Sequence, residues 1–198
     1  MNVIKTEIPG VILFEPKVFQ DSRGSFFELW KDESYLSYGI PRHFRQDNVS
    51  TSEKGVLRGL HFQSPNSQGK LVSVLSGSVF DVVVDTRLGS PTFGQSMSFV
   101  LSSANKRQLY VPEGMAHGFC VTSDSATFFY KCTDTYHPES EYTLAWNDPE
   151  LNIKWPLQQV YLSNKDKLGK TLSELMDVLP QFDYYKTTTG SEKTVESH

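Results

Sequence analysis

The chain has few cysteines, no long apolar run and no excess of positive charge. Only two cysteines occur among 198 residues, Cys120 and Cys132, without CxxC or Cys/His spacing, so we predict two buried, reduced thiols. No stretch approaches the ~20 apolar residues of a membrane span, and the N-terminal MNVIKTEIPG lacks a basic segment followed by an apolar one. We therefore expect a soluble, cytoplasmic protein that does not bind a membrane.

The charge balance limits the partners of the chain. Its formal net charge is −4 at pH 7, which argues against a generally basic protein that binds nucleic acid or a membrane surface. An anionic ligand would therefore have to be met by a local cluster of basic residues.

The composition is that of one globular domain. Hydrophobic residues make up 38% of the chain and aromatic residues 13%, which is typical of a folded protein of this length. We predict a single domain over residues 1–185. The polar tail 186–198, KTTTGSEKTVESH, is predicted to be disordered.

Short apolar runs separated by turn residues predict a mainly β fold. Residues 71–85 have the strongest pattern, two runs rich in β-branched residues around a Ser-Gly turn, and predict a hairpin. Many short strands with turns every eight to twelve residues favour an antiparallel jelly-roll barrel, a double-stranded β-helix of the cupin type, with few short helices. The other strands are expected at residues 11–14, 18–19, 25–30, 55–62, 93–101, 108–111, 118–121, 126–133 and 142–146.

Two helices are expected. The first covers residues 32–38, begins at the cap-type residue Asp32 and stops at Gly39. The second is a C-terminal helix that begins near the cap-type residues Ser163 and Asp166. It is predicted by leucines at spacings of four, three and four, namely Leu168, Leu172, Leu175 and Leu179.

The stretch from Gly55 to Lys70, GVLRGLHFQSPNSQGK, combines a buried-strand pattern with polar chemistry. It carries Arg58 and His61 within apolar residues and reaches Lys70 after a Pro-Asn-Ser loop. Charged groups in such a strand are costly unless they are paired or used. We predict that this stretch forms the floor of a pocket for an anion, with His61 as the proton-transfer group.

A jelly roll with two histidine-bearing strands raises the possibility of a metal-binding cupin. The first cupin motif, G-x5-H-x-H, is kept at Gly55 and His61, but Gln63 stands at the second histidine position. The second motif, P-x-G-x2-H, ends at His117, but Val121 stands where an asparagine is expected. Two imidazoles without a third ligand leave a transition metal short of its usual coordination. We therefore predict no metal, and imidazoles free to move protons.

Taken in order, the motifs resemble one family, the dTDP-4-dehydrorhamnose 3,5-epimerases. The similarity covers nearly all of residues 3–180, and only the combination is specific. The matching stretches are 19–24 with 26–28 (FQDSRG, FFE), 46–50 (QDNVS), 55–63, 68–72 (QGKLV), 79–92 with D-x-R-x-G-S-P-T, 110–119, 130–131 (YK), 146–149 (WNDP) and 162–166 (LSNKD).

The resemblance implies an isomerase that inverts the carbons flanking the C4 ketone of a dTDP-linked 4-keto-6-deoxy sugar, without metal or nicotinamide. The expected product is dTDP-4-dehydro-L-rhamnose, made from dTDP-4-dehydro-6-deoxy-D-glucose for polysaccharide or other glycoside synthesis such as O-antigen. The family also implies a homodimer in which each nucleotide site is shared between the subunits.

Epimerisation beside a ketone needs a base, a group that stabilises the enolate and an acid on the opposite face. By resemblance, His61 is the base and Asp166 the carboxylate that orients it. Lys70 and Arg58 are the cations beside the enolate and the diphosphate, and Tyr130 is the acid. By pattern alone, His61 and Tyr130 also fit core residues, Lys70 a solvated charge and Asp166 a helix-start carboxylate.

The resemblance also supplies substrate-binding residues. Tyr136 is expected to stack near the base, and His117 to line the pocket, contact the sugar or phosphate, or remain as a relic of the cupin scaffold. Gln46 and Asn48 would make amide contacts, or would be ordinary polar turn residues. The segment expected to bind the nucleotide of the neighbouring subunit contains Arg23, Phe26 and Glu28, with the last two on one strand face.

Three alternatives stay open from the sequence. The first is a 3-epimerase or 5-epimerase that acts on another deoxysugar, because a second inversion depends on fine placement of the acid. The second is a non-catalytic jelly roll that binds a nucleotide sugar. The third is a metal-dependent cupin oxygenase.

Overall fold

The computed structural model describes residues 1–41 and 43–183, so the predicted tail 186–198 and the predicted domain end at 185 lie outside the described residues. The strands are β1 (Asn2–Lys5), β2 (Ile12–Glu15), β3 (Val18–Asp21), β4 (Gly24–Phe27), β5 (Gln46–Glu53), β6 (Leu57–Gln63), β7 (Lys70–Ser76), β8 (Ser78–Asp85), β9 (Ser96–Ser102), β10 (Gln108–Val111), β11 (Met115–Val121), β12 (Ser125–Cys132) and β13 (Glu141–Thr143). The helices are α1 (Asp32–Leu36), α2 (Asn164–Lys167) and the 3-10 turns η1 (Pro138–Ser140) and η2 (Ser173–Val178).

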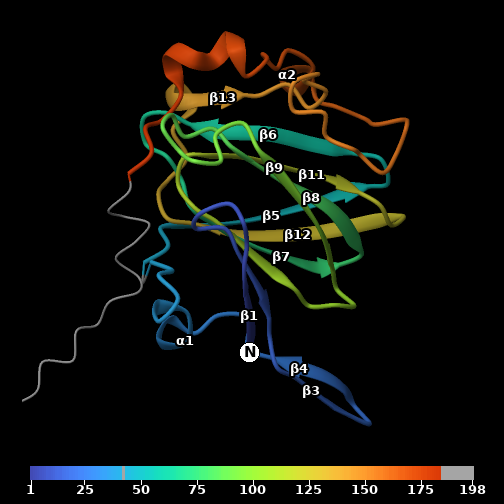
Figure 1. Ribbon diagram of the computed structural model, residues 1–198. Coiled ribbons are helices and arrows are strands. Elements are labelled where there is room, and N and C mark those ends of the chain that lie inside the picture. The colour runs from blue at the N-terminus through green and yellow to red at the C-terminus, as the bar shows by residue number, and fades with distance from the viewer. Residues whose placement is uncertain (42, 184–198) are drawn as a thin grey trace, which may run out of the picture.

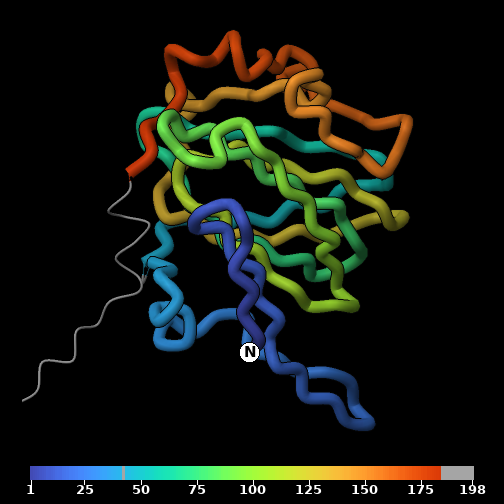
Figure 2. The backbone as a smooth tube through the Cα atoms, in the orientation of Figure 1, coloured from blue at the N-terminus to red at the C-terminus, as the bar shows by residue number. Residues whose placement is uncertain are grey.

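Two antiparallel sheets face each other and form the barrel. One has six strands in the order β1-β2-β10-β7-β12-β5, and the other has five in the order β13-β6-β11-β8-β9. Figure 1 shows the two layers, and Figure 2 shows the short β3–β4 hairpin projecting away from them. The predicted class, a mainly β jelly roll with few short helices, is confirmed.

Alternation along the strands fills the space between the sheets. Val72 and Val74 of β7 and Leu109 of β10 point inward from the six-stranded sheet and meet Val79 and Val83 of β8. Because successive side chains of a strand point to opposite faces, the residues between them point outward. The inner core therefore uses every second residue of each central strand.

The outer face of each sheet is also covered. On the five-stranded sheet, Leu172, Leu175 and Leu179 of the C-terminal segment pack on Val82 and Val84 of β8. Figure 1 shows this segment lying across the β13 side of the barrel. On the six-stranded sheet, an aromatic and aliphatic layer covers the outer residues, and its members are Ile12, Phe14, Leu71 and Tyr110 with Tyr35 and Ile40.

The predicted hairpin over residues 71–85 is wrong. Both strands form, but β7 pairs with β10 and β12, whereas β8 pairs with β9 and β11, so the Ser-Gly turn joins the two sheets. Gly77 makes this connection with φ +77, and an added Cβ would lie 2.0 Å from the Ser125 carbonyl oxygen. Local spacing cannot distinguish a hairpin from a connection between sheets.

The predicted continuous C-terminal helix is also wrong. Ser163 caps α2, as its hydroxyl accepts from the Asp166 amide, but α2 ends at Lys167 and η2 begins only at Ser173. Between them Lys170 runs beside the extension of β13, where its carbonyl accepts from the Ala145 amide at 2.7 Å. Leu168 consequently points to solvent and is 80% exposed. The sheet edge takes the backbone hydrogen bonds that the helix would have used.

Smaller differences concern the N-terminal third. The strand expected at residues 25–30 ends at Phe27, and two strands, β1 and β5, were not expected. The first helix forms, but its N-cap is Lys31 without a side-chain cap, so Asp32 lies in the first turn.

No helix among residues 1–41 and 43–183 is long and apolar enough to span a membrane.

Candidate active site

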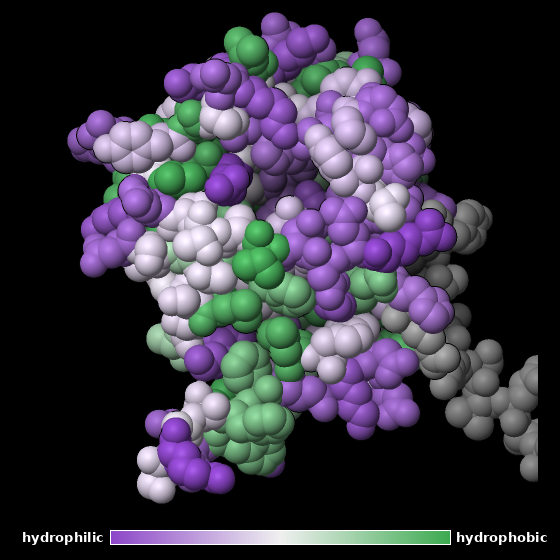
Figure 3. Space-filling model, turned by 180° about the vertical axis from the view of Figure 1, so that it is seen from behind, coloured by the Kyte–Doolittle hydropathy of each residue, from purple (hydrophilic) through white to green (hydrophobic). Residues whose placement is uncertain are grey.

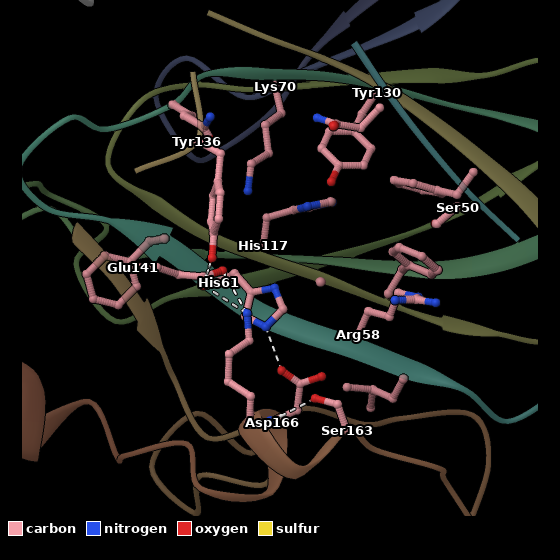
Figure 4. Close-up of a pocket in the computed structure, with 18 of the residues that line it drawn as sticks. Ser50, Arg58, His61, Lys70, His117, Tyr130, Tyr136, Glu141, Ser163 and Asp166 are labelled. Carbon is pink, nitrogen blue, oxygen red and sulfur yellow. Dashed lines mark hydrogen bonds and ion pairs between the residues drawn. The ribbon is translucent and has the colours of Figure 1, made fainter. Parts of the chain in front are cut away.

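A cavity of about 830 Å³ lies between the two sheets. It is within the size range of pockets for small molecules and cofactors. Figure 4 shows side chains from both sheets converging on it. The structure brings together there most of the predicted site residues, which are Gln46, Asn48, Arg58, His61, Lys70, His117, Tyr130, Tyr136 and Asp166.

An imidazole and a carboxylate from distant parts of the chain meet on one side of the cavity. Nε2 of His61, on β6, lies 2.6 Å from Oδ1 of Asp166, on α2, and Asp166 is buried. Burial by itself would raise the pKa of Asp166, but the hydrogen bond and the charge of His61 and the bond to Ser163 hold that pKa below its ordinary value. An ionised Asp166 fixes the tautomer of His61 and stabilises its protonated form.

A phenol and an ammonium reach the cavity from the opposite sheet. Tyr130 on β12 and Lys70 at the start of β7 point toward the centre, facing His61 in Figure 4. Burial raises the pKa of the Tyr130 phenol, so the group keeps its proton at neutral pH. Burial also lowers the pKa of the Lys70 ammonium. This arrangement places ionisable groups on opposite sides of the cavity.

Close backbone packing positions Arg58 and the two histidines. Gly59 has φ +118, and a Cβ there would lie 2.7 Å from Cα of Gly118 and 2.8 Å from the carbonyl oxygen of His117. This contact occurs where the register between β6 and β11 shifts. Arg58 crosses the neighbouring part of the cavity and donates from Nε to the Ser52 hydroxyl at 3.0 Å.

A second polar group fixes Tyr136 beside the His61 side of the cavity. The Tyr136 hydroxyl donates to Oε2 of Glu141 at 2.7 Å, and Lys165 Nζ donates to both Glu141 oxygens at 2.9 Å. Burial would raise the pKa of Glu141, but these bonds hold it below its ordinary value. Figure 4 shows the Tyr136 side chain extending to the same side of the cavity as His61.

Gln46 and Asn48 belong to a strand, β5, and not to a turn. The amide of Gln46 donates to Oδ1 of Asn48 at 3.0 Å, and its oxygen accepts from the Tyr136 amide at 2.8 Å. Asn48 in turn donates to the sulfur of Cys132 at 3.7 Å. Both side chains line the cavity and also brace its wall.

Three predicted residues are not brought to this cavity within one chain. Arg23 lies at the tip of the β3–β4 hairpin and pairs with Asp21 at 2.6 Å, and Phe26 is 70% exposed on the same hairpin. Figure 3 shows apolar residues gathered on this projecting arm. Phe26 and Glu28 were expected on one strand face, which is wrong because β4 ends at Phe27.

Sequence reasoning missed several polar residues of the site. Asp81 is fully buried on β8 and both its oxygens lie within 3.0 Å of Nε2 of His117. A signal was present, since Asp81 falls at an inward position between Val79 and Val83. Glu141 and Lys165 gave no such signal, because their partners come from other segments.

Within residues 1–41 and 43–183, no group of three or more His, Cys, Asp or Glu side chains is arranged to hold a metal ion. The two histidines of the cavity are each hydrogen-bonded to a carboxylate, His61 to Asp166 and His117 to Asp81. Such pairs are suited to proton transfer and to charge stabilisation.

The fold and the site define a cupin-like jelly roll whose cavity holds imidazole, phenol and ammonium groups from its two sheets. A family model described as dTDP-4-dehydrorhamnose 3,5-epimerase matches residues 5–174. The chain belongs to the dTDP-4-dehydrorhamnose 3,5-epimerase family. This confirms the resemblance inferred from the motifs.

Individual relatives agree with this membership. The dTDP-4-dehydrorhamnose 3,5-epimerase of Pseudomonas aeruginosa is 53% identical over 176 residues, which cover 88% of this chain and 97% of the relative. The protein of the same name from Neisseria gonorrhoeae is 53% identical over 175 residues, 88% of this chain, and the chain spans only 53% of that relative.

A solved structure has the same fold. It is the crystal structure of dTDP-6-deoxy-D-glucose-3,5-epimerase from Legionella pneumophila Philadelphia 1 in complex with dTDP-4-keto-L-rhamnose. It is similar to this chain with a TM-score of 0.89 and 54% identity, covering 92% of this chain and 98% of that one.

Proposed function

We propose that this protein epimerises C3 and C5 of dTDP-4-dehydro-6-deoxy-D-glucose and so produces dTDP-4-dehydro-L-rhamnose. One observation carries the proposal. The His61–Asp166 pair lies on the side of the cavity formed by the five-stranded sheet, and Tyr130 lies opposite it on the six-stranded sheet. Family membership and the sugar nucleotide bound by the Legionella pneumophila enzyme support the choice of substrate.

In the proposed mechanism, His61 removes the proton from a carbon beside the C4 ketone, and the electron pair moves to the ketone oxygen. Asp166 stabilises the imidazolium that forms, at a distance of 2.6 Å. Lys70 and Arg58 stabilise the enolate and the diphosphate as fixed positive charges. Tyr130 then delivers a proton from the opposite face, which inverts the carbon.

We propose that the nucleotide half of the site is completed by a second copy of the chain. The β3–β4 hairpin projects from the barrel and exposes Phe19 and Phe26, while Arg23 lies at its tip. An exposed apolar arm of this kind fits an interface between subunits. The arm of one subunit would then bind the nucleotide held by Gln46 and Asn48 of its neighbour.

We place the reaction in the cytoplasm. The two cysteines are free and buried in the described chain. Free thiols are the rule in a reducing compartment, so they fit this location.

The decisive experiment is solvent exchange. In D2O, the protein should introduce deuterium at both C3 and C5 of dTDP-4-dehydro-6-deoxy-D-glucose, as read by NMR. Label at one carbon alone would show that the protein is a single-site epimerase and not a double epimerase. Absence of exchange together with tight dTDP binding would instead indicate a non-catalytic nucleotide-sugar-binding protein.

The role of His61 has its own test. The variant His61→Ala should lose exchange at both carbons. Among the described residues, Asp166 is paired with no other imidazole that could replace His61 as the base. Binding of dTDP, measured by calorimetry, should stay within about threefold of the wild type, since His61 is assigned to the sugar carbons. Wild-type turnover in this variant would refute the assignment.

A further inference from the structure

A buried carboxylate inside the barrel has no part in the mechanism above. Asp81 is 0% exposed and lies on β8 between Val79 and Val83, facing the space between the sheets. A carboxylate in such a place is costly unless it is paired. Its Oδ1 and Oδ2 lie 2.9 and 3.0 Å from Nε2 of His117, on the adjacent strand β11. The whole interaction of Asp81 is therefore directed at one imidazole nitrogen.

The other nitrogen of that ring is open to the cavity. His117 is 6% exposed and its ring stacks on Phe128 with centroids 6.2 Å apart. Nδ1 of His117 has no hydrogen-bond partner among the described residues. Every fully buried side-chain nitrogen or oxygen of those residues does have a partner, so Nδ1 is not fully buried. Nδ1 must therefore be accessible from the cavity that His117 lines. Asp81 holds one side of the ring so that the other side faces the cavity.

The surroundings of His117 are rich in groups that titrate. His61 is its cross-strand neighbour on β6, and Lys70 is electrostatically coupled to Asp81 from the opposite sheet. The Lys70 ammonium makes no hydrogen bond or ion pair with the described residues, so its charge is directed to the cavity. Besides Asp81, the ionisable groups near the ring are His61 and Arg58 on the adjacent strand β6, and Lys70 and Tyr130 on the opposite sheet. The remaining ionisable side chains that line the cavity are Tyr136, Glu141, Tyr161, Lys165 and Asp166.

The charges of Asp81, His117 and Lys70 together favour an anionic ligand atom. Burial raises the pKa of Asp81, and the charge and hydrogen bond of His117 and the charge of Lys70 oppose this rise. With Asp81 ionised and both Lys70 and His117 protonated, the three groups carry one net positive charge. A neutral ketone leaves that charge unbalanced, whereas an enolate oxygen neutralises it. The cluster would consequently bind the enolate more strongly than the substrate, which is the condition for catalysis.

We infer that Asp81 is a positioning residue for epimerisation: it holds His117 with Nδ1–H directed at the C4 oxygen, and it is the counter-ion of the protonated ring that donates this hydrogen bond to the enolate. The proton that leaves carbon still goes to His61, and the electron pair goes to the C4 oxygen. His117 contributes a hydrogen bond from Nδ1, and no covalent bond forms to it. This inference rests on the proposed function.

The main test is Asp81→Asn, which keeps the size of the side chain and one oxygen for Nε2–H but removes the charge. We expect kcat for deuterium exchange to fall about 10- to 100-fold with KM within about threefold, because the lost interaction acts on the enolate. The alkaline limb of the kcat profile should move to lower pH, because protonated His117 loses its counter-ion. A structural brace between β8 and β11 would lower thermal stability and leave this limb in place.

Asp85→Asn is the matched control. Asp85 is the other buried carboxylate of β8, but it pairs with Arg87 at 2.8 Å and lies outside the cavity. Its replacement should lower the Tm without moving the pH profile of kcat. If both variants change kcat and its pH profile alike, the effect belongs to the strand and the inference is overturned.

A double-mutant cycle with His117→Asn shows whether Asp81 acts through His117. In the His117→Asn background, Asp81→Asn should lower kcat by no more than about twofold, because the partner is already gone. Independent, multiplying effects of the two substitutions would refute the inference.

Nitrogen-15 NMR of the wild-type protein gives a test that needs no stable variant. The protonated ring carries a proton on both nitrogens, and once it is neutral at high pH the remaining proton should lie on Nε2, against Asp81. A remaining proton on Nδ1 would overturn the inference. The proposed function fails separately, if the wild type exchanges no carbon-bound proton at all. Wild-type exchange with an unaffected Asp81→Asn variant would reject only the role of Asp81.

Discussion

At the scale of single residues, the site separates its proton-transfer groups by placing them on different sheets. His61 belongs to the five-stranded sheet and Tyr130 to the six-stranded sheet, and both line the cavity between them. The carboxylate of Asp166 supports the first group, whereas burial keeps the second one protonated. The proposed removal and return of a proton on opposite faces depend on this placement in two sheets.

Replacement of Tyr130 by Phe tests the division of labour. The variant loses only a hydroxyl, so the barrel and the cavity should be kept, while epimerised product forms about 10²- to 10⁴-fold more slowly. His61 can still remove a proton and return a deuteron to the same face, so exchange with retained configuration should persist in D2O. Loss of exchange and epimerisation to the same extent would show that Tyr130 does not act as the separate acid.

The pairing of Asp166 with His61 predicts how the thermal stability of the protein falls in acid. Its pKa is lowered in the folded protein, so the ionised carboxylate adds stability above its ordinary pKa near 4. That contribution is lost as the pH falls through the lowered value. Between about pH 5 and pH 3, the Tm of the wild type should therefore fall more steeply than that of Asp166→Asn. Parallel Tm curves for the two proteins would contradict this account of the pair.

At the scale of elements, the approach of β6 to β11 determines where the two histidines point. Gly59 and Gly118 face each other at the shift in register, and His61 and His117 lie in paired positions beside it. A side chain at either glycine would separate the strands. The two glycines thereby determine how the two histidines are placed in the site.

Gly59→Ala tests this control, with Gly89→Ala as its match. Both glycines have positive φ, +118 and +83, but only at Gly59 would the new Cβ meet backbone atoms within 3 Å. Both variants should lose about 1 kcal/mol through backbone strain. Gly59→Ala should lose about 1–3 kcal/mol more through overpacking, and kcat should fall as well. Chemical denaturation provides the comparison, and equal losses would exclude the proposed packing role.

At the scale of the whole molecule, the β3–β4 arm is the part that the single chain does not explain. It packs on neither core sheet, exposes Phe26 and presents Arg23 away from the cavity. A second copy would give these residues a function, since the apolar residues could be buried between subunits.

Mixing two inactive variants tests whether the arm acts on the neighbouring subunit. His61→Ala keeps the arm and loses the base, whereas Arg23→Ala keeps the base and loses the arm contact. Co-refolded at equal amounts, they should regain about a quarter of wild-type activity at low substrate, because half of the dimers are mixed and each contains one intact site. No recovery in confirmed mixed dimers would place the arm in its own subunit's site.

Several parts of the site were predictable because their signal is local. His61, Arg58 and Lys70 stand within one stretch whose pattern is that of a strand, and Gln63 in the second cupin position argued against a metal. Asp166, 105 residues beyond His61, was assigned by resemblance alone, since nothing in its own segment indicates which group it meets. Asp81 was overlooked although its inward register was readable, because its partner lies on another strand.

The sequence by itself determined the class of fold, the existence of most strands and the chemical groups of the site, because alternation, turns and residue types are local properties. Tertiary structure alone decided that β7 and β8 enter different sheets, that the last leucines pack without a continuous helix, and that Asp81 and Asp166 each hold a histidine. Competition for backbone hydrogen bonds and for pairing of buried charges decides these features, and it involves residues far apart in the chain.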